Sequence, residues 1–488
     1  MRWIALSLIC VAAAGVAATA ATARPDARSV IIATTGRTAP LATGISDPLF
    51  QRPHATTAYT MASKTGATYV RLMAPWASIA PKTLPVSGFD PADPASPYYH
   101  WSSLDASLSA AQAAGLTPIL DIIAPPAWAY NVEPGTWTGG SPKIADLGAF
   151  ATAIATHYDG SGPAPAVHIF SVWNEPNYNK NLFPQSPTLY RSMVNAVADS
   201  VHAVNPSNLV LAGELAPFRR ITTDRNHAIP PLTFMRSMLC LSTTTPVHRT
   251  CNTPAKFDVW THHPYSNSGP YGKAPTSGGV ELGDLPKMNK LLQTAERLGA
   301  IASARPVQFW VTEVGWDSNP PNTKGVPLGL EARWVAETMY QMWKSGVTVG
   351  IWFLLQDRPI STPFQSGLYF RSSSPLADAQ AKPLLTPFSF PFVAYLKSHG
   401  DVQIWGRDTT SDMRDVTIQE QTRAGGLWKT VATVTSNNYG IFRATLSLGA
   451  KYTYSLRAVA PGSGGSRAFS LKVPINENLS VTPFPLSN

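Results

Sequence analysis

Eight short, apolar and β-branched segments alternate with longer amphipathic segments along most of this chain. The apolar segments are residues 44–46, 69–73, 118–123, 167–173, 209–213, 257–262, 307–313 and 348–355. Near-continuous apolar strands separated by helices are typical of a parallel sheet that helices cover. Eight such units match the count of a closed (β/α)8 barrel. We therefore expect an α/β chain with such a barrel over residues 42–398.

The barrel region is longer than the ~250 residues typical of this fold, so some loops are expected to carry insertions. Two candidates are residues 131–142 and the stretch around Cys240 and Cys251. An open, doubly wound sheet is the alternative. It would be expected to carry a glycine-rich phosphate loop after its first strand, and the sequence has none there.

A different pattern follows residue 398. Short alternating segments at residues 415–421, 428–435, 441–448, 452–459 and 468–473 are separated by clusters of turn-forming residues. This pattern predicts a small all-β sandwich of immunoglobulin-like size over residues 399–480, followed by a tail at 481–488. We expect the sandwich to serve as a packing or spacer module, and carbohydrate binding is the alternative.

The N-terminus has the features of a secretory signal peptide. Arg2 precedes a mostly apolar run that ends at the small residues Ala21-Thr22-Ala23. A membrane anchor is the alternative, but the run is shorter than ~20 apolar residues and is interrupted by Ser7 and Gly15. We expect residues 1–23 to be a signal, residues 24–41 a lead-in segment, and the protein to be secreted without a transmembrane span.

Export to an oxidising compartment predicts a disulfide between Cys240 and Cys251, with two free buried thiols as the alternative. The formal net charge of +9 arises from 38 basic and 29 acidic residues. These charges are scattered, and the basic residues form only short pairs such as Arg219-Arg220. A nucleic-acid partner is therefore not expected.

Two of the apolar segments end in a glutamate with aromatic neighbours. The motifs are Trp173-Asn174-Glu175-Pro176 and Thr312-Glu313-Val314-Gly315-Trp316. Side chains at the carboxyl ends of barrel strands face the mouth of the barrel. Two carboxyl groups that face one another there suit glycoside hydrolysis. Structural ion pairs at both strand ends are the alternative interpretation.

These paired motifs resemble the acid/base and nucleophile motifs of clan A retaining glycoside hydrolases. That clan includes the cellulase-type family five and the β-xylosidase-type family thirty-nine. The resemblance covers residues 42–398 and implies Glu175 as the general acid/base and Glu313 as the nucleophile. It also implies that Asn174 hydrogen-bonds the 2-hydroxyl of the sugar.

Further positions resemble the same clan. Arg71, near the end of the second strand, would hydrogen-bond the nucleophile. After the sixth strand, Tyr265 would approach the nucleophile and His263 the glycone. The adjacent His262 and His263 also suggest a metal, but neighbouring residues on a strand point to opposite faces. We expect neither a metal nor a cofactor.

In the clan, the eighth strand carries an aromatic side chain that serves as a platform for the sugar and is followed by an aspartate. The end of the eighth strand in this chain, residues 351–357, resembles that pattern. Trp352 is the expected platform, although counting back from Asp357 indicates Phe353 instead. Trp76, Trp128 and Trp316 could stack on sugar rings, and burial in the core is the alternative for each. Glu214 could contact the glycone, and a solvated position in a loop is its alternative.

The sequence therefore predicts a secreted, retaining O-glycosidase that acts on poly- or oligosaccharides by double displacement. The alternative is a non-catalytic carbohydrate-binding protein of the cell surface, built on a degenerate barrel. A serine or metal hydrolase is disfavoured, because the sequence contains neither a GxSxG nor an HExxH motif.

Overall fold

The structure is a computed structural model. It describes residues 30–31, 39–53, 55–85, 87–217, 221–222, 227–372, 376–397, 400–410, 413–449 and 454–472. The predicted signal peptide (1–23), most of the predicted lead-in, the Arg219-Arg220 pair and the predicted tail (481–488) lie outside the described residues.

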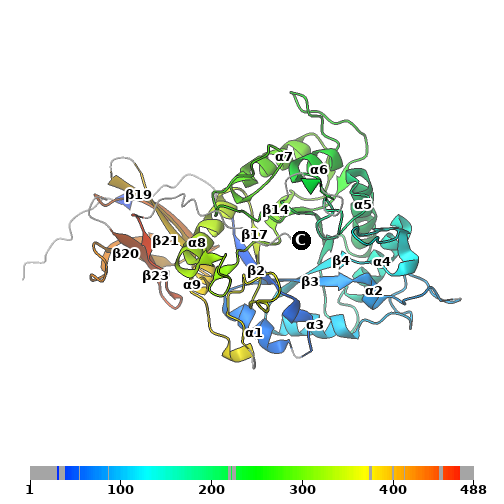
Figure 1. Cartoon of the computed structure of the whole chain (residues 1–488), viewed down its shortest axis with the longest axis horizontal. Coiled ribbons are helices and arrows are strands. Elements are labelled where there is room, and N and C mark those ends of the chain that lie inside the picture. Colours follow the sequence, from blue (N-terminus) through cyan, green and yellow to red (C-terminus); the bar gives the residue numbers. More distant parts are fainter. Residues whose placement is uncertain are drawn as a thin grey trace, which may run out of the picture.

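Eight parallel strands close into a barrel, seen to the right of Figure 1. In order around the barrel they are β2 (Ala42–Ser46), β3 (Tyr69–Pro75), β4 (Thr117–Ile123), β7 (Ile169–Val172), β8 (Leu209–Leu215), β12 (Val259–His262), β14 (Gln308–Val311) and β17 (Val349–Phe353). The last strand pairs with the first, with Trp352 opposite Ile45. The predicted (β/α)8 barrel is confirmed.

Helices surround this barrel (Figure 1). They are α1 (Thr56–Lys64), α2 (Trp76–Ile79), α3 (Ser102–Ala113), α4 (Ile144–His157), α5 (Pro187–Val204), α6 (Pro231–Met238), α7 (Leu285–Arg297), α8 (Leu328–Lys344) and α9 (Leu385–Ser389). The start of α5 shows how the sequence sets such boundaries. Ser186 accepts a hydrogen bond from the Leu189 amide, and Pro187 occupies the first turn, where its missing N–H costs nothing. None of the helices in the described part of the chain is long and apolar enough to cross a membrane.

The loops carry short elements of their own. They are the 3-10 turns η1 (Pro48–Gln51), η2 (Ala127–Ala129), η3 (Leu282–Asp284) and η4 (Leu376–Asp378), and the two- or three-residue strands β5 (Tyr130–Val132), β6 (Ser141–Pro142), β9 (Ile221–Thr222), β10 (His227–Ala228), β11 (Ala255–Lys256), β13 (Ile301–Ala302), β15 (Ser318–Asn319) and β16 (Val326–Pro327). The β5–β6 hairpin occupies the predicted insertion at 131–142. In the second predicted insertion, Cys240 and Cys251 form the expected disulfide, with Cα atoms 5.6 Å apart.

The barrel interior changes from apolar to polar along the strands. One buried cluster contains Ile119, Ile169, Leu211, Val259, Trp310, Val349 and Ile351. Because side chains alternate across a strand, the next inward residue after Ile119 is Asp121, and the next after Ile169 is Ser171. The carboxyl ends of the strands therefore enclose a layer of polar side chains that lies above an apolar plug.

The C-terminal region forms two antiparallel sheets. One has the order β1 (Val30–Ile31), β22 (Ile441–Ser447), β19 (Asp401–Arg407) and β18 (Phe392–Leu396). The other contains β21 (Lys429–Thr435), β20 (Asp415–Gln421), β23 (Ser455–Ala460) and β24 (Gly464–Gly465), with β25 (Phe469–Ser470) also paired to β23. An all-β region after the barrel is thereby confirmed.

The sheets extend beyond the predicted range of 399–480. The strand β18 precedes the expected boundary but pairs along its whole length with β19. The strand β1, from the expected lead-in, pairs with β22. The predicted barrel range of 42–398 includes the apolar run of β18, because the sequence does not show which partner a strand will find.

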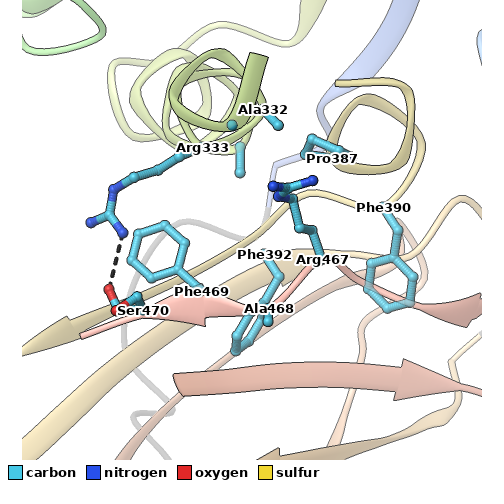
Figure 2. A pocket seen from close by; sticks show the side chains of 11 residues that line it. Ala332, Arg333, Pro387, Phe390, Phe392, Arg467, Ala468, Phe469 and Ser470 are labelled. Atoms are coloured by element: carbon cyan, nitrogen blue, oxygen red, sulfur yellow. Dashed lines mark hydrogen bonds between the residues drawn. The ribbon is translucent and has the colours of Figure 1, made fainter. Parts of the chain in front are cut away.

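The β region packs directly against α8. The rings of Tyr340 and Trp343 in α8 lie 5.5 and 5.6 Å from the ring of Trp405 in β19. A small pocket opens along the same boundary, as Figure 2 shows. On one side of it, the Arg333 guanidinium lies 3.9 Å from the centre of the Phe469 ring and donates a hydrogen bond to the Ser470 carbonyl.

Candidate active site

Glu175 and Glu313 follow β7 and β14 and meet at the mouth of the barrel. The Nδ1 atom of His263 lies 3.1 Å from Oε1 of Glu175 and 3.9 Å from Oε2 of Glu313. These two carboxylate oxygens are therefore at most 7.0 Å apart, since both distances share one atom. Their side chains are 17% and 11% exposed, so both acids line one opening that solvent reaches.

Two donors orient the Glu313 carboxylate. Oε1 accepts a hydrogen bond from Nη1 of Arg71 at 2.7 Å, and Oε2 accepts one from the Tyr265 hydroxyl at 2.9 Å. Burial and the nearby Glu313 charge raise the pKa of Tyr265 well above its ordinary value. Tyr265 therefore remains a neutral donor, and Glu313 is held in one orientation as an acceptor.

Arg71 joins the buried polar side chains beneath the two acids. Its Nη2 atom lies 2.5 Å from Asp121, 2.9 Å from the side-chain oxygen of Asn174 and 3.2 Å from Glu214. Burial lowers the pKa of Arg71, but the charges of Glu214, Asp121 and Glu313 raise it more, so the net shift is upward. The guanidinium is a permanent cation among three carboxylates.

The contact with Arg71 also determines what Asn174 can offer. Because the Asn174 side-chain oxygen accepts from the guanidinium, the amide NH₂ group is left to donate. A donor beside Glu313 fits the predicted contact with a sugar hydroxyl.

His263 is completely buried and contacts both Glu175 and Glu214. Its Nε2 atom lies 2.8 Å from Oε2 of Glu214. Burial lowers the pKa of His263, but the Glu313 charge and the hydrogen bonds to Glu175 and Glu214 outweigh it and raise the pKa to about 10. The ring is therefore an imidazolium at neutral pH, and both of its nitrogens donate.

Glu214 lies beneath the opening and does not line it. It is fully buried, and its oxygens accept hydrogen bonds from Ser171, Thr312 and His263. Burial raises the pKa of Glu214, but Arg71 and His263 outweigh burial and lower it to about 2. The expected contact of Glu214 with the glycone is therefore wrong, and so is the solvated-loop alternative. Glu214 is a structural anion.

Three members of this network were missed by the sequence analysis: Asp121, Ser171 and Thr312. Each is completely buried, and burial outweighs Arg71 to raise the pKa of Asp121 to about 7. The sequence does contain a pattern that identifies these three residues. Each is a polar residue within or at the end of an apolar strand, two positions beyond a residue that packs in the barrel plug.

The backbone around the acids is strained. Trp173, Glu175 and Glu214 have φ angles of 68°, 46° and 49°, which non-glycine residues rarely adopt. The Glu175 amide donates to the Glu214 carbonyl at 3.0 Å, which couples the two strand ends. Strain of this kind clusters at functional sites, where the surrounding structure must hold it.

The eighth strand corrects the expected platform. Trp352 is completely buried between the barrel and the helices, where its indole N–H donates to the Ser366 carbonyl. Since Val349 and Ile351 belong to the barrel plug, alternation turns Phe353 inward and Trp352 outward. Of the two candidates for the platform, Phe353 therefore faces the barrel interior, and it is the residue that the count back from Asp357 indicates.

The other tryptophans are mainly core residues. Trp76 and Trp316 are completely buried, and the Trp316 indole donates to the Ser266 carbonyl. Trp128 is half-buried and donates to the Pro81 carbonyl. The core alternative therefore holds for Trp76 and Trp316, and only Trp128 retains accessible surface.

The two adjacent histidines point apart, as expected on a strand. His262 contacts the Val280 carbonyl in the outer layer, while His263 points inward to Glu175. Among the described residues no group of three or more His, Cys, Asp or Glu side chains is arranged to hold a metal ion.

Comparisons with known proteins support the architecture. No family model and no curated protein sequence matches the chain. Among solved structures, it is similar to a monomeric β-xylosidase from Caulobacter crescentus, with 14% sequence identity and a TM-score of 0.50 over 86% of this chain and 97% of that one. A GH39 β-xylosidase structure from Caulobacter crescentus matches with the same identity, TM-score and share of this chain, over 98% of its own length. At this identity the likeness establishes the fold.

Proposed function

We propose that the chain is a glycoside hydrolase that cleaves O-glycosidic bonds with retention of configuration. One observation carries the proposal: Glu175 and Glu313, at two different strand ends, approach the same nitrogen of His263 within 3.1 and 3.9 Å. Retaining enzymes need two carboxyl groups ~5–5.5 Å apart across the scissile bond. A further support is that both acids are partly exposed while their partners Arg71 and His263 are fully buried.

In the first step, Glu313 attacks the anomeric carbon while Glu175 donates a proton to the departing oxygen. His263 donates to Oε1 of Glu175 at 3.1 Å, whereas the hydrogen bond that Oε2 accepts from the Asn181 side-chain amide is longer, at 3.4 Å. We therefore assign the proton to Oε2. Arg71 and Tyr265 hold the Glu313 carboxylate towards the sugar. The products of this step are the free leaving group and a glycosyl ester of Glu313.

In the second step, Glu175 accepts a proton from water, and the water oxygen attacks the anomeric carbon from the side that the leaving group vacated. The ester bond to Glu313 breaks and its carboxylate is regenerated. The Asn174 amide can donate to the sugar 2-hydroxyl, a contact that strengthens in the transition state of such reactions. Two inversions give net retention without a metal or cofactor.

The similar structures suggest where a search for substrate begins. Both are described as β-xylosidases, so aryl β-xylosides and xylo-oligosaccharides are the first substrates to test. We also propose that the protein is secreted. The predicted signal and the Cys240–Cys251 disulfide support export, and N-terminal sequencing of the exported protein tests the cleavage site.

Removal of the nucleophile tests the mechanism. We expect Glu313→Ala to lower kcat for an activated aryl glycoside by about 10⁴-fold or more, because covalent catalysis is lost. Azide fits the space left by the carboxylate and should restore turnover, with a glycosyl azide of inverted configuration as product. The exposed Asp378→Ala is the control.

Two results would overturn the proposal. Undiminished activity of Glu313→Ala would show that Glu313 is not the nucleophile. Retained sugar binding by the wild-type protein, without turnover of any member of a glycan panel, would favour the non-catalytic alternative.

A further inference from the structure

An aromatic pair with an arginine on top of it lies at the end of the eighth strand. Strand alternation turns the Phe353 side chain inward. The residue lies beside the Glu313 strand end, because its amide donates to the carbonyl of Val314 at 3.0 Å. The Phe364 ring stands at 90° to the Phe353 ring, with centres 5.2 Å apart. The Arg358 guanidinium lies 5.2 Å from the Phe364 ring and 6.0 Å from the Phe353 ring.

The position of Phe364 is held against backbone strain. Its φ of 82° is unfavourable for a bulky residue, whereas glycine adopts it freely. The next residue, Gln365, is fixed on both sides: its amide donates to Asp317 at 2.8 Å, and its carbonyl accepts from Lys382 at 2.9 Å. Strain that a buried network maintains points to a role for the Phe364 ring itself.

The Arg358 guanidinium is available to bind an anionic ligand. Its guanidinium makes no hydrogen bond or ion pair with any residue in the described ranges, and the side chain is only partly buried. Asp47 is the buried carboxylate whose pKa responds to the Arg358 charge, but its oxygens already accept from the amides of Leu49, Leu355 and Gln356. The guanidinium therefore keeps its planar donor edge available.

We propose that Phe353, Phe364 and Arg358 form a subsite for a sugar residue that carries a carboxylate. The apolar face of the sugar packs on the phenylalanine pair, and the guanidinium binds the carboxylate through two parallel hydrogen bonds. The formal net charge of +9 favours the approach of an acidic polymer. This inference rests on the proposed function, because it names the substrate class of the same opening.

The test compares each acidic polymer with its carboxyl-reduced form. The two forms differ only in that the carboxylate of each acidic sugar is replaced by a primary alcohol. Glucuronoxylan, alginate and polygalacturonate are the probes, and binding is measured by titration to a Glu313→Gln variant that cannot consume them. We expect at least one native polymer to bind about tenfold or more tightly than its reduced form. Adding Arg358→Gln should abolish that difference.

Two further variants make the result specific. Arg423→Gln removes the same charge from an exposed turn of the β region and should leave the preference intact. Phe364→Gly relieves the backbone strain, so it should fold at least as stably while binding both forms about fivefold or more weakly. Equal binding of native and reduced polymers, or equal effects of Arg358→Gln and Arg423→Gln, would overturn the subsite.

Failure of the subsite and failure of the proposed function give different results. If the wild-type protein hydrolyses neutral glycosides and Arg358→Gln changes nothing, the function stands and the subsite is wrong. If acidic polymers bind through Arg358 but no glycoside is hydrolysed, the subsite stands and the function is wrong.

Discussion

His263 is a buried cationic side chain that lies close to three acids of the site. It touches Glu175 and Glu214 and lies 3.9 Å from Glu313, so three carboxylates share one imidazolium. Removing one partner from a buried ion pair costs about 3–5 kcal/mol, because the remaining charge is left without compensation. The ring therefore stabilises the fold and also fixes the position of Glu175.

The raised pKa of His263 makes its contribution depend on pH. In the folded protein the pKa is about 10, against 6.5 for an ordinary histidine. The stabilising charge is thus fully present below about pH 6.5 and is lost as the pH rises through 10. We expect the free energy of unfolding of wild type minus that of His263→Gln, from urea titrations, to shrink between pH 6.5 and 10. A constant difference would contradict the assignment of a buried imidazolium.

Tyr265 provides a second test at this scale. Tyr265→Phe removes one donor to Glu313 and keeps the ring, so folding should be unaffected. Loss of one such donor lowers kcat by about 10²-fold. Steady-state kinetics on an aryl glycoside measure the effect, with the exposed Tyr439→Phe as the control. Unchanged kinetics would remove Tyr265 from the site.

At the scale of elements, strand alternation explains both what the sequence predicts and what it misses. The strand ends that carry Glu175, Glu313, Arg71 and His263 were recognisable from apolar runs and motifs, and the structure brings them together. The orientation of Trp352 and the role of Asp121 depend on which face of the strand enters the barrel. The sequence does not show which alternate residues of a strand face inward. In the structure, Ile351 and Ile119 pack in the apolar plug, and this sets the direction of their neighbours.

The Asp47 carboxylate adds to the pairing of β2 with β17 that closes the barrel. Asp47 follows β2 and accepts from the amides of Leu355 and Gln356, which follow β17. Asp47→Ala would leave these buried amides without a partner, at about 1–3 kcal/mol each. We expect a loss of about 2–5 kcal/mol in the free energy of unfolding, measured in urea. Asp378→Ala, on an exposed turn, should change it by less than about 0.5 kcal/mol.

At the scale of the whole molecule, the barrel and the β region are in contact through α8. Tyr340 and Trp343 of α8 are buried by Trp405 and Tyr395, and the Tyr271 hydroxyl in the loop after β12 donates to the Tyr395 hydroxyl at 2.5 Å. That loop also carries Tyr265. The sequence analysis expected a packing or spacer module, and these contacts agree with the packing role. The sequence could not show which segments make the contact, because they lie far apart along the chain.

This contact predicts coupled unfolding. Trp405→Ala removes a ring from the centre of the boundary and should destabilise the protein by about 3–5 kcal/mol. Because both parts share the boundary, we expect calorimetry to show one transition that moves to lower temperature as a whole. Two separate transitions, of which only one responds to the substitution, would contradict a shared core.

The central claim is that the Glu313 carboxylate forms a covalent bond to the sugar. An activated 2-deoxy-2-fluoroglycoside slows the second step more than it slows leaving-group departure, so the glycosyl ester accumulates. Intact-protein and peptide mass spectrometry should then find one fluoroglycosyl group per chain, on the peptide that contains Glu313, and none in Glu313→Gln. Turnover of the parent glycoside with the label on another residue would contradict the account.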